Sequence, residues 1–507
     1  MSENNYKTSS AQIASNSIFL YLRQILIMAV GLITVRVTLH LLGTEDYGVY
    51  NVVAGAVTLF SFLVGAVGMG AQRFFSFYIG KGNKEQLQKV FTNTFTIYLI
   101  LAVIVVLLTE IVGMYLLETK LIIPEGRMLA AKIVFQFACI TLFFSIMQAP
   151  FMALVIAHEN LKVFAQLGIY DAVTKLLLVF LLTIVPVDKL ILYAILHMLV
   201  VLSCSLFYQY FCSHYYEECK LRVSWDKSMA LEILSYNGWN LWGQLSGVVK
   251  SQGISIMLNI FFGPIINAAL QIANQVRGLC VTLSQNFTAA VNPQIIKSYS
   301  ANDYERLFRL AFSSAKLNFV LMSVLILPIF FHVEYLLGLW LGDIPEYTIL
   351  ICKLLAFDSL MEVVSTPFAT INQATGKIGL YQFIIGIVGL LNLPFAYIAL
   401  RLDTNPIWVF IIGIALQCCI ALIRVIFVNR VKKEMTISAI IKVYIPCLLF
   451  LWISLALSWL FISPAHSILS LCGYGATQVA MVVILAYIVV FNKAEKQLIG
   501  SLIKKKF

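Results

Sequence analysis

Residues 91–117 read FTNTFTIYLILAVIVVLLTEIVGMYLL and contain a single charged side chain, that of Glu110. A helix needs about 20 mostly apolar residues to cross the hydrocarbon core of a bilayer, and this stretch is long enough. Similar segments recur along the chain and give fourteen predicted spans, which begin near residues 15, 47, 91, 131, 163, 190, 229, 265, 307, 347, 379, 407, 440 and 467. Lipid cannot satisfy exposed backbone polar groups, so the spans should be helices. The sequence predicts an all-α integral membrane protein.

The composition supports the same fold class. Of the 507 residues, 61% are hydrophobic and 12% are charged, whereas a soluble domain is roughly half apolar and about a quarter charged. This much apolar surface cannot be hidden in one water-soluble core. The polar N-terminus precedes a long apolar segment without a small-residue cleavage site, so the first span is expected to be a retained anchor.

Lys and Arg residues are divided unevenly between the two sides of the predicted bundle. Connections on the N-terminal side carry most of them, whereas the other side carries only Lys120, Arg127, Lys132, Lys189 and Arg401. This asymmetry predicts that both termini are cytoplasmic. The net charge of +11 is then mainly a topology signal, with some attraction to anionic lipid head groups, and no nucleic-acid partner is expected.

A faint internal repeat predicts how the spans are grouped. LLGTEDYGVYNVVAGAV, which starts at Leu41, aligns with FFGPIINAALQIANQVR, which starts at Phe261, and Gly43 falls opposite Gly263. We therefore expect a six-helix bundle at 1–213, a second at 214–430, and two extra helices with a basic cytoplasmic tail at 431–507. Parallel repeats of this kind usually hold the transport site between them.

Residues 267–294, NAALQIANQVRGLCVTLSQNFTAAVNPQ, are unusually polar for a predicted span. At 100° per residue their amides form a stripe along one helix face, and the preceding span has a similar stripe. Amides facing lipid would be unsatisfied, so the stripes should face protein or water. Hydrogen bonding between helices is one interpretation; a wet substrate cavity is the one we favour. Its expected members are Asn237, Asn240, Gln244, Gln271, Asn274, Gln275 and Gln285.

Several cations lie within the predicted spans, where an ionisable group is costly and indicates function. Arg277 is near the middle of its span, beside the amide stripe, and Arg23 is about two turns into the first span. Both are candidates for substrate binding. Arg36 and Lys250 are further candidates, with an interfacial anchor or an internal ion pair as the alternative for each.

Acidic residues in the spans are candidates for ion coupling. Asp171 and Lys175 are four residues apart and can pair on one helix face, so a structural role is equally open to them. Asp358 and Glu362 share a face and could bind a cation or a proton, with Lys353 as a possible counter-ion. The deep charges are more cationic than acidic overall. Such a cavity would attract anions, and a guanidinium suits phosphate oxygens because it donates two parallel hydrogen bonds.

Nothing in the sequence indicates an enzyme. Every connection is too short for a catalytic domain, and there is no phosphate-binding glycine loop or nucleophile elbow. Cys212, His214 and Cys219 come closest to a metal cluster, but their spacing is a weak signal. We expect no metal and no cofactor, and the cysteines should be reduced thiols.

Four stretches carry a resemblance to a known family: LLGTEDYGVYNVV (41–53), MGAQRFFSFYIGKGNKEQLQKVF (69–91), ENLKVFAQLGIYDAVTKLLLVFLL (159–182) and INQATGKIGLYQFIIGIVGLLNLPFAYIAL (371–400). The chain resembles Wzx-type polysaccharide flippases, the lipopolysaccharide, O-antigen and capsule biosynthesis proteins of the multidrug/oligosaccharidyl-lipid/polysaccharide (MOP) exporter superfamily. The resemblance covers essentially the whole chain.

The resemblance implies a specific transport reaction. An undecaprenyl-pyrophosphate-linked oligosaccharide would cross the bacterial inner membrane by alternating access of two bundles, for export of O-antigen, capsule or exopolysaccharide. Arg23 and Arg277 are the residues that match the pyrophosphate-binding arginines of similar flippases. The expected partners are the lipid-linked oligosaccharide, the lipid bilayer and polysaccharide assembly proteins.

Three other functions remain open from the sequence. A cation-coupled multidrug or metabolite exporter of the same superfamily should depend on buried carboxylates. A membrane scaffold would not need the two amide stripes. A glycan polymerase or ligase should have a sizeable outer loop, which the sequence lacks.

Overall fold

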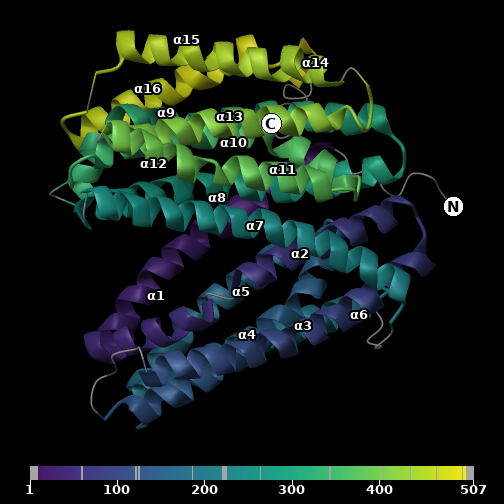
Figure 1. The fold of residues 1–507 in the computed structure, drawn as a ribbon, viewed down its shortest axis with the longest axis vertical. Coiled ribbons are helices and arrows are strands. Elements are labelled where there is room, and N and C mark those ends of the chain that lie inside the picture. The colour runs from purple at the N-terminus through teal and green to yellow at the C-terminus, as the bar shows by residue number, and fades with distance from the viewer. Residues whose placement is uncertain are drawn as a thin grey trace. The chain divides into compact units, whose positions relative to one another are not determined.

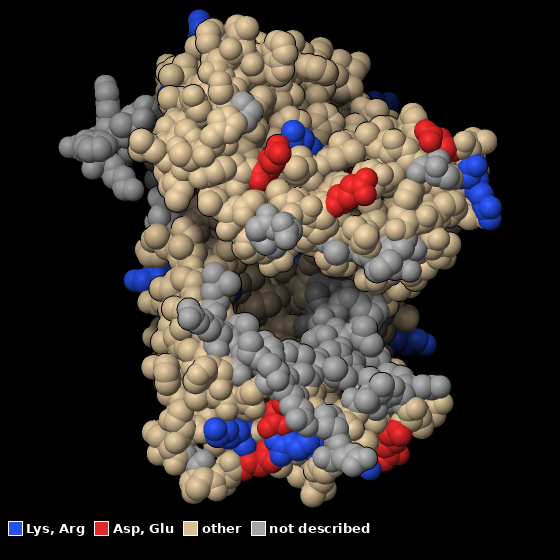
Figure 2. Space-filling model, turned by 90° about the vertical axis from the view of Figure 1, so that its left-hand side faces the viewer, with Lys and Arg blue, Asp and Glu red and all other residues tan. Residues whose placement is uncertain are grey.

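The prediction of an all-α membrane protein is confirmed by the computed structural model. It describes residues 10–58, 61–119, 123, 126–184, 186–219, 225–262, 264–341, 344–403, 405–433, 435–463, 465–493 and 495–497, and within these ranges the regular structure is helical throughout, without strands. Ten helices in the described part are long and apolar enough to cross a membrane. On the face shown in Figure 2, uncharged residues predominate, as expected for a surface in contact with lipid.

Each of the fourteen predicted spans falls on helical structure, and four of them lie outside the ten apolar helices. Those four lie on α1, the junction of α1 and α2, α8 and α10. The last two carry the amides and the acids that the sequence singled out, so they are less apolar than the others. The structure therefore supports ten of the spans by length and composition, and the other four stay predictions.

The chain separates into two compact units, Met1–Leu241 and Trp242–Phe507. The first contains α1 (Ser10–Thr58), α2 (Ser61–Gly80), α3 (Lys84–Thr119), α4 (Met128–Ala157), α5 (Leu161–Val179), a 3₁₀ turn η1 (Phe180–Thr183) and α6 (Lys189–Tyr215). The division falls inside α7 (Lys227–Phe262), whereas the sequence repeat places a boundary before this helix. The predicted division at 213/214 and 430/431 stays a prediction.

The second unit continues from α7 with α8 (Pro264–Ser300), α9 (Tyr304–Leu341), α10 (Thr348–Ala374), α11 (Gly379–Leu390), α12 (Asn392–Leu402) and α13 (Ile407–Val428). The chain then forms α14 (Met435–Ala439), a π-helical turn η2 (Ile440–Tyr444), α15 (Ile445–Phe461), α16 (Ile468–Leu485) and a second π-helical turn η3 (Ala486–Val490). In this unit α10 packs against α8, α9 and α13, and α15 and α16 pack on α9 (Figure 1).

Within the first unit, α1 packs against α5, and α4 packs against α2, α3 and α6. The path of α1 changes at Gly43, whose φ of 80° breaks the helical conformation. Glycine adopts positive φ without the steric cost that a Cβ would bring, so the long helix can turn there. Just beyond this point, Arg127 forms an ion pair with Asp46 of α1 and another with Asp188, the N-cap residue of α6.

Candidate functional site

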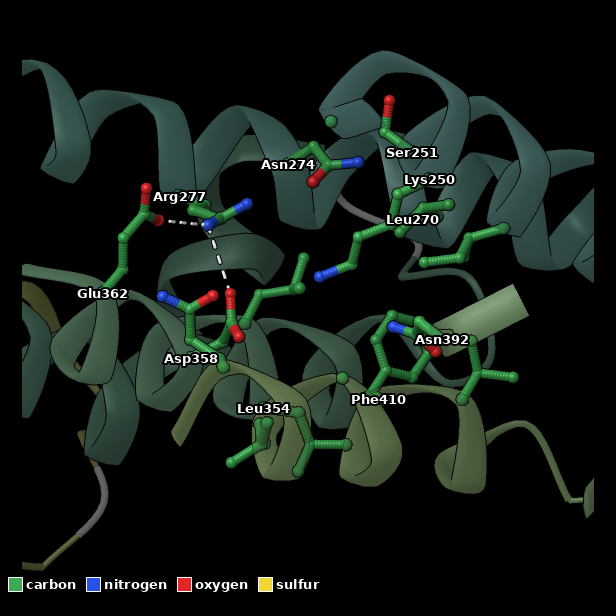
Figure 3. Close-up of a pocket in the computed structure, with 17 residues that line it drawn as sticks. Lys250, Ser251, Leu270, Asn274, Arg277, Leu354, Asp358, Glu362, Asn392 and Phe410 are labelled. Carbon is green, nitrogen blue, oxygen red and sulfur yellow. Dashed lines mark hydrogen bonds and ion pairs between the residues drawn. The ribbon is translucent and has the colours of Figure 1, made fainter. Parts of the chain in front are cut away.

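The second unit contains a cavity of about 280 Å³ at the centre of its helices. Its walls come from α7, α8, α10, α12 and α13 (Figure 3). Beneath it lies a hydrophobic core that includes Leu258, Leu270, Ile351 and Phe410, with Leu270 and Phe410 forming part of the cavity wall. The polar members of the lining are Lys250, Ser251, Asn274, Arg277, Asp358, Glu362, Asn392 and Gln417.

Arg277 lies against α10 and is held there by three hydrogen bonds. Its Nε donates to Ser359 Oγ at 2.9 Å, and its Nη2 donates to Glu362 Oε2 at 2.7 Å and to Asp358 Oδ2 at 3.1 Å. Asp358 and Glu362 are four residues apart on one helix, so a single guanidinium reaches both carboxylates. The side chain of Asp358 is 13% exposed and that of Glu362 is 39% exposed. The sequence predicted that these acids share a face, and Arg277 is their counter-ion.

Lys353, the counter-ion considered from the sequence, occupies another position. Its ammonium lies 5.2 Å from the centre of the Phe330 ring. Lys353 is one turn and a half before Asp358 along α10, so it points to a different face of the helix.

Lys250 on α7 has its side chain directed into the same cavity (Figure 3). Among the described residues it has no ion-pair partner, in contrast to Arg277. The cavity thus contains two cations and two carboxylates, and the carboxylates are both bound to Arg277. The four formal charges of the described lining sum to zero, and Lys250 is the cation among them that no carboxylate contacts directly.

A second group of charged residues lies in the first unit, around Arg23 on α1. Its guanidinium lies 4.5 Å from the centre of the Phe164 ring, and it crosses Gly168 so closely that a Cβ there would overlap the guanidinium. The buried Nε of Arg23 has no hydrogen-bond partner among the described residues. One turn further along α5, Lys175 Nζ donates to Asp171 Oδ2 at 2.9 Å, as the sequence spacing predicted.

The amide stripe predicted on α7 is divided between the two units. Asn237 and Asn240 are buried in the first, whereas Gln244 is half-buried and belongs to the second. Asn237 packs against Gly70, and both its amide atoms are buried without a hydrogen-bond partner in the described part of the chain.

On α8, one of the predicted amides lines the cavity. Asn274 does so together with Arg277, whereas Gln271, Gln275 and Gln285 are exposed and are absent from its lining. The side chain of Arg36 lies outside the described residues.

The cavity also contains polar residues that the sequence interpretation missed. Asn392 and Gln417 are nearly buried and line it, and Ser359 accepts a hydrogen bond from Arg277. A sequence signal for the two amides exists, because each is the one amide in a mostly apolar helix. Ser359 had no such signal, since a serine in a helix commonly bonds its own backbone.

Solved structures of transporters share the fold. The crystal structure of a MATE protein in the straight conformation is 15% identical and has a TM-score of 0.71; the match covers 86% of this chain and 99% of that one. An outward-facing multidrug resistance MATE family transporter of the MOP superfamily matches at 15% identity and a TM-score of 0.69, over 85% of this chain and 99% of that one. A MOP superfamily transporter from Pyrococcus furiosus Vc1 (DSM3638), described as having a binding pocket of reverse polarity, matches at 15% identity and a TM-score of 0.66, with coverage of 85% and 99%. No curated protein matches the sequence.

The apolar helices show a multi-pass membrane protein, and the matches to two family models define it as a transporter of the MOP exporter superfamily and not an enzyme. Within that class, the model of the polysaccharide biosynthesis protein family matches residues 13–298, more than half of the chain, and the protein belongs to this family. The MatE family model matches residues 248–398, which include Lys250, Arg277, Asp358 and Glu362.

Proposed function

We propose that the protein is a flippase that carries an undecaprenyl-pyrophosphate-linked oligosaccharide across the bacterial inner membrane by alternating access. The oligosaccharide would serve export of O-antigen, capsule or exopolysaccharide. The observation that carries the proposal is the ammonium of Lys250, which lines the cavity without a direct ion pair or hydrogen bond among the described residues. Membership of the polysaccharide biosynthesis family supports the choice of substrate class.

The cavity can serve a saccharide and a phosphate at the same time. Lys250 offers an unpaired ammonium, which binds phosphate as a compact point charge. Asn274, Asn392 and Gln417 offer amide donors and acceptors, which suit sugar hydroxyls. The cavity volume of about 280 Å³ accommodates a phosphate and a sugar ring, but not a whole oligosaccharide. The cavity is therefore proposed as the binding site for the pyrophosphate-proximal end.

Arg277 can take part only if its carboxylate contacts change. A phosphate oxygen would compete with Glu362 and Asp358 for the same guanidinium nitrogen. The freed carboxylates would then be able to take up a cation or protons, which would link ion binding to substrate binding. In the first unit, the partly unsatisfied guanidinium of Arg23 is a further site for the substrate anion, and Asp171 and Lys175 are ion-coupling candidates. Arg36 remains a candidate from the sequence.

The proposed direction is energetically favoured across a bacterial membrane. Moving negative charge outward through an inside-negative potential releases about 2.3 kcal/mol per charge per 100 mV.

The test is translocation in reconstituted vesicles. A labelled lipid-pyrophosphate oligosaccharide would be incorporated, and its appearance on the far side measured for the wild type and for Lys250→Ala. We expect the variant to lose most of the activity while retaining its fold, and Lys432→Ala, which removes an exposed cation outside the cavity, to behave like the wild type. Normal translocation by Lys250→Ala would overturn the proposed substrate site.

A second candidate is a cation-coupled multidrug exporter, which the carboxylates Asp358 and Glu362 and the MATE-like fold favour. Its substrates would be organic cations, which the unpaired Lys250 would repel. Export of a cationic dye, abolished by Asp358→Asn and improved by Lys250→Gln, would support this candidate against the flippase.

A further inference from the structure

A second cavity, of about 450 Å³, lies in the same unit at the ends of the C-terminal helices. One wall is the first part of α9, another is η2 with the start of α15, and the third is the end of η3 with the residues after it. None of the residues proposed for substrate binding or ion coupling lines this cavity. This second cavity is therefore separate from the proposed transport site.

The charged lining of this cavity is strongly basic. Among the described residues of the lining, Arg309, Lys316 and Lys442 are the cations, and Glu495 is the one acid. Glu495 is already satisfied, because it accepts from Lys316 Nζ at 3.1 Å, from Ser313 Oγ at 2.7 Å and from the backbone N–H of Asn492 at 2.9 Å. Its pairing with Lys316 leaves two uncompensated positive charges in the cavity.

Arg309 and Lys442 provide those two charges. Both side chains are exposed, and neither has a carboxylate partner among the described residues. They come from segments far apart in the sequence, α9 and the π-helical turn η2. Single π-helical turns within longer helices are rare and often occur at functional sites, and this one contributes Lys442 to the cavity.

Apart from Ser313 and Asn492, which donate hydrogen bonds to Glu495, the rest of the described lining is apolar. Phe312, Pro446, Val489, Val490 and Phe491 form the wall beside the cations. A freely soluble anion has no apolar part that could pack against this wall. A molecule with a negatively charged head and an apolar body would match both parts of the lining, and a cavity of this size is typical of small-ligand sites.

The position in the predicted topology fits the same kind of ligand. Arg309 belongs to the basic side of the bundle, and so do the basic runs that flank α14 to α16. Basic pockets between transmembrane helices on the cytoplasmic side are known to bind anionic lipid head groups. The leaflet at this side supplies such lipids at high local concentration.

We propose that this cavity binds the phosphate head group of an anionic phospholipid. Arg309 and Lys442 contact the phosphate oxygens, and the ion pair of Lys316 with Glu495 forms the polar floor. The apolar wall packs on the glycerol and the first part of the acyl chains. The lipid would thereby tie α15 and η3 to α9, whatever substrate the transporter carries.

The experiment measures lipid retention by the full-length protein. Wild type and Arg309→Gln/Lys442→Gln would be reconstituted in bilayers of phosphatidylcholine with or without phosphatidylglycerol. Bound phosphatidylglycerol would then be counted by native mass spectrometry. Each cation near a lipid surface contributes about 1 kcal/mol, so removing two should weaken binding by roughly tenfold or more. Arg309→Lys should retain most of it, because the charge is kept.

Two controls distinguish the site from its alternatives. Lys432→Gln/Lys433→Gln removes the same charge from exposed positions outside the cavity and should leave lipid retention unchanged. Inorganic phosphate, added to the protein in phosphatidylcholine alone, should neither bind nor raise the melting temperature as phosphatidylglycerol does. Equal retention by the wild type and Arg309→Gln/Lys442→Gln would overturn the proposal. So would equal loss in the control variant, or stabilisation by free phosphate alone.

Discussion

Arg277 on α8 donates a hydrogen bond of 2.7 Å to Glu362 on α10, across the interface between these two helices. The same nitrogen also donates to Asp358, one turn earlier on α10. A partly buried guanidinium without counter-ions would be costly, and so would two neighbouring carboxylates without a cation. The contact between α8 and α10 therefore gives the guanidinium its counter-ions and compensates one of the two carboxylate charges, and the ammonium of Lys250 in the same cavity balances the other.

Arg277→Ala should lower the thermal stability of the protein in detergent. The change leaves Asp358 and Glu362 as adjacent like charges without the guanidinium that bonds to both. Breaking a fully buried ion pair costs about 3–5 kcal/mol; here the cost should be about 1–3 kcal/mol, because the side chain of Glu362 is 39% exposed and solvent screens it. A fluorescence-monitored melting curve would measure the loss.

The matched control for this prediction also removes the negative charges of the two carboxylates. Arg277→Ala combined with Asp358→Asn and Glu362→Gln should recover most of the lost stability, since neutral amides can share hydrogen bonds. If the combined variant melted no higher than Arg277→Ala, the ion pairs would not be the source of the effect.

Gly168→Ala should impair transport with little effect on stability. A Cβ at this position overlaps the guanidinium of Arg23, which is the flexible end of a side chain and can move away. The helix propensity of alanine offsets part of the steric cost, so the net change should stay below about 1 kcal/mol. If Arg23 binds the substrate anion, displacing it should lower vesicle translocation towards the level of Arg23→Ala.

Gly475→Ala on α16 is the control for that substitution, because no atom of the described residues outside its own helix backbone lies within 4 Å of its added Cβ. It should translocate normally. Wild-type activity in Gly168→Ala alongside a defective Arg23→Ala would show that the position of the guanidinium over α5 is unimportant.

Arg127→Ala should destabilise the first unit. Arg127 Nε donates to Asp46 at 2.7 Å, and its Nη1 donates to Asp188 Oδ2 at 2.5 Å, so one side chain joins α1 to the N-terminus of α6. All three side chains are partly exposed, and the expected loss is about 1–2 kcal/mol after solvent screening. Lys132→Ala removes a more exposed pair with Glu118 and should cost about 0.5 kcal/mol or less. Equal melting temperatures for the two variants would contradict this ranking.

The sequence predicted the fold class well because a bilayer imposes a simple rule on length and composition. Residues 91–117 illustrate this: their apolar length alone required a helix, and they lie within α3. The hydropathy of α8 is a weaker indication of a membrane span, because its amides and Arg277 make it less apolar. Its helical period still identified the face that carries Asn274.

Ion pairs within one helix could be predicted from the sequence, whereas ion pairs between helices could not. Asp171 and Lys175 were paired correctly, since four residues make one helical turn. The counter-ion of Asp358 was misjudged, because the nearest cation in sequence, Lys353, lies on another face of α10, whereas Arg277 comes from another helix. Pairs between helices are set by packing, which a single sequence does not reveal.

Glu218→Gln should reduce stability at neutral pH and have a smaller effect in acid. Burial opposes ionisation of Glu218, but its 2.5 Å hydrogen bond and charge interaction with His158 outweigh burial and lower the pKa of the carboxyl. A lowered folded-state pKa contributes stability above the unfolded-state value, near pH 4.3 for glutamate, and this contribution is lost as the pH falls through the folded-state pKa. The melting-temperature difference between the wild type and Glu218→Gln should therefore shrink between about pH 5 and pH 3.

The neighbouring Glu217, whose side chain is 80% exposed in its pair with Lys84, provides the control for this prediction. Glu217→Gln should change the melting temperature little at any pH. A constant difference for Glu218→Gln over this range would contradict the assignment of its stabilising role to the ionised carboxyl.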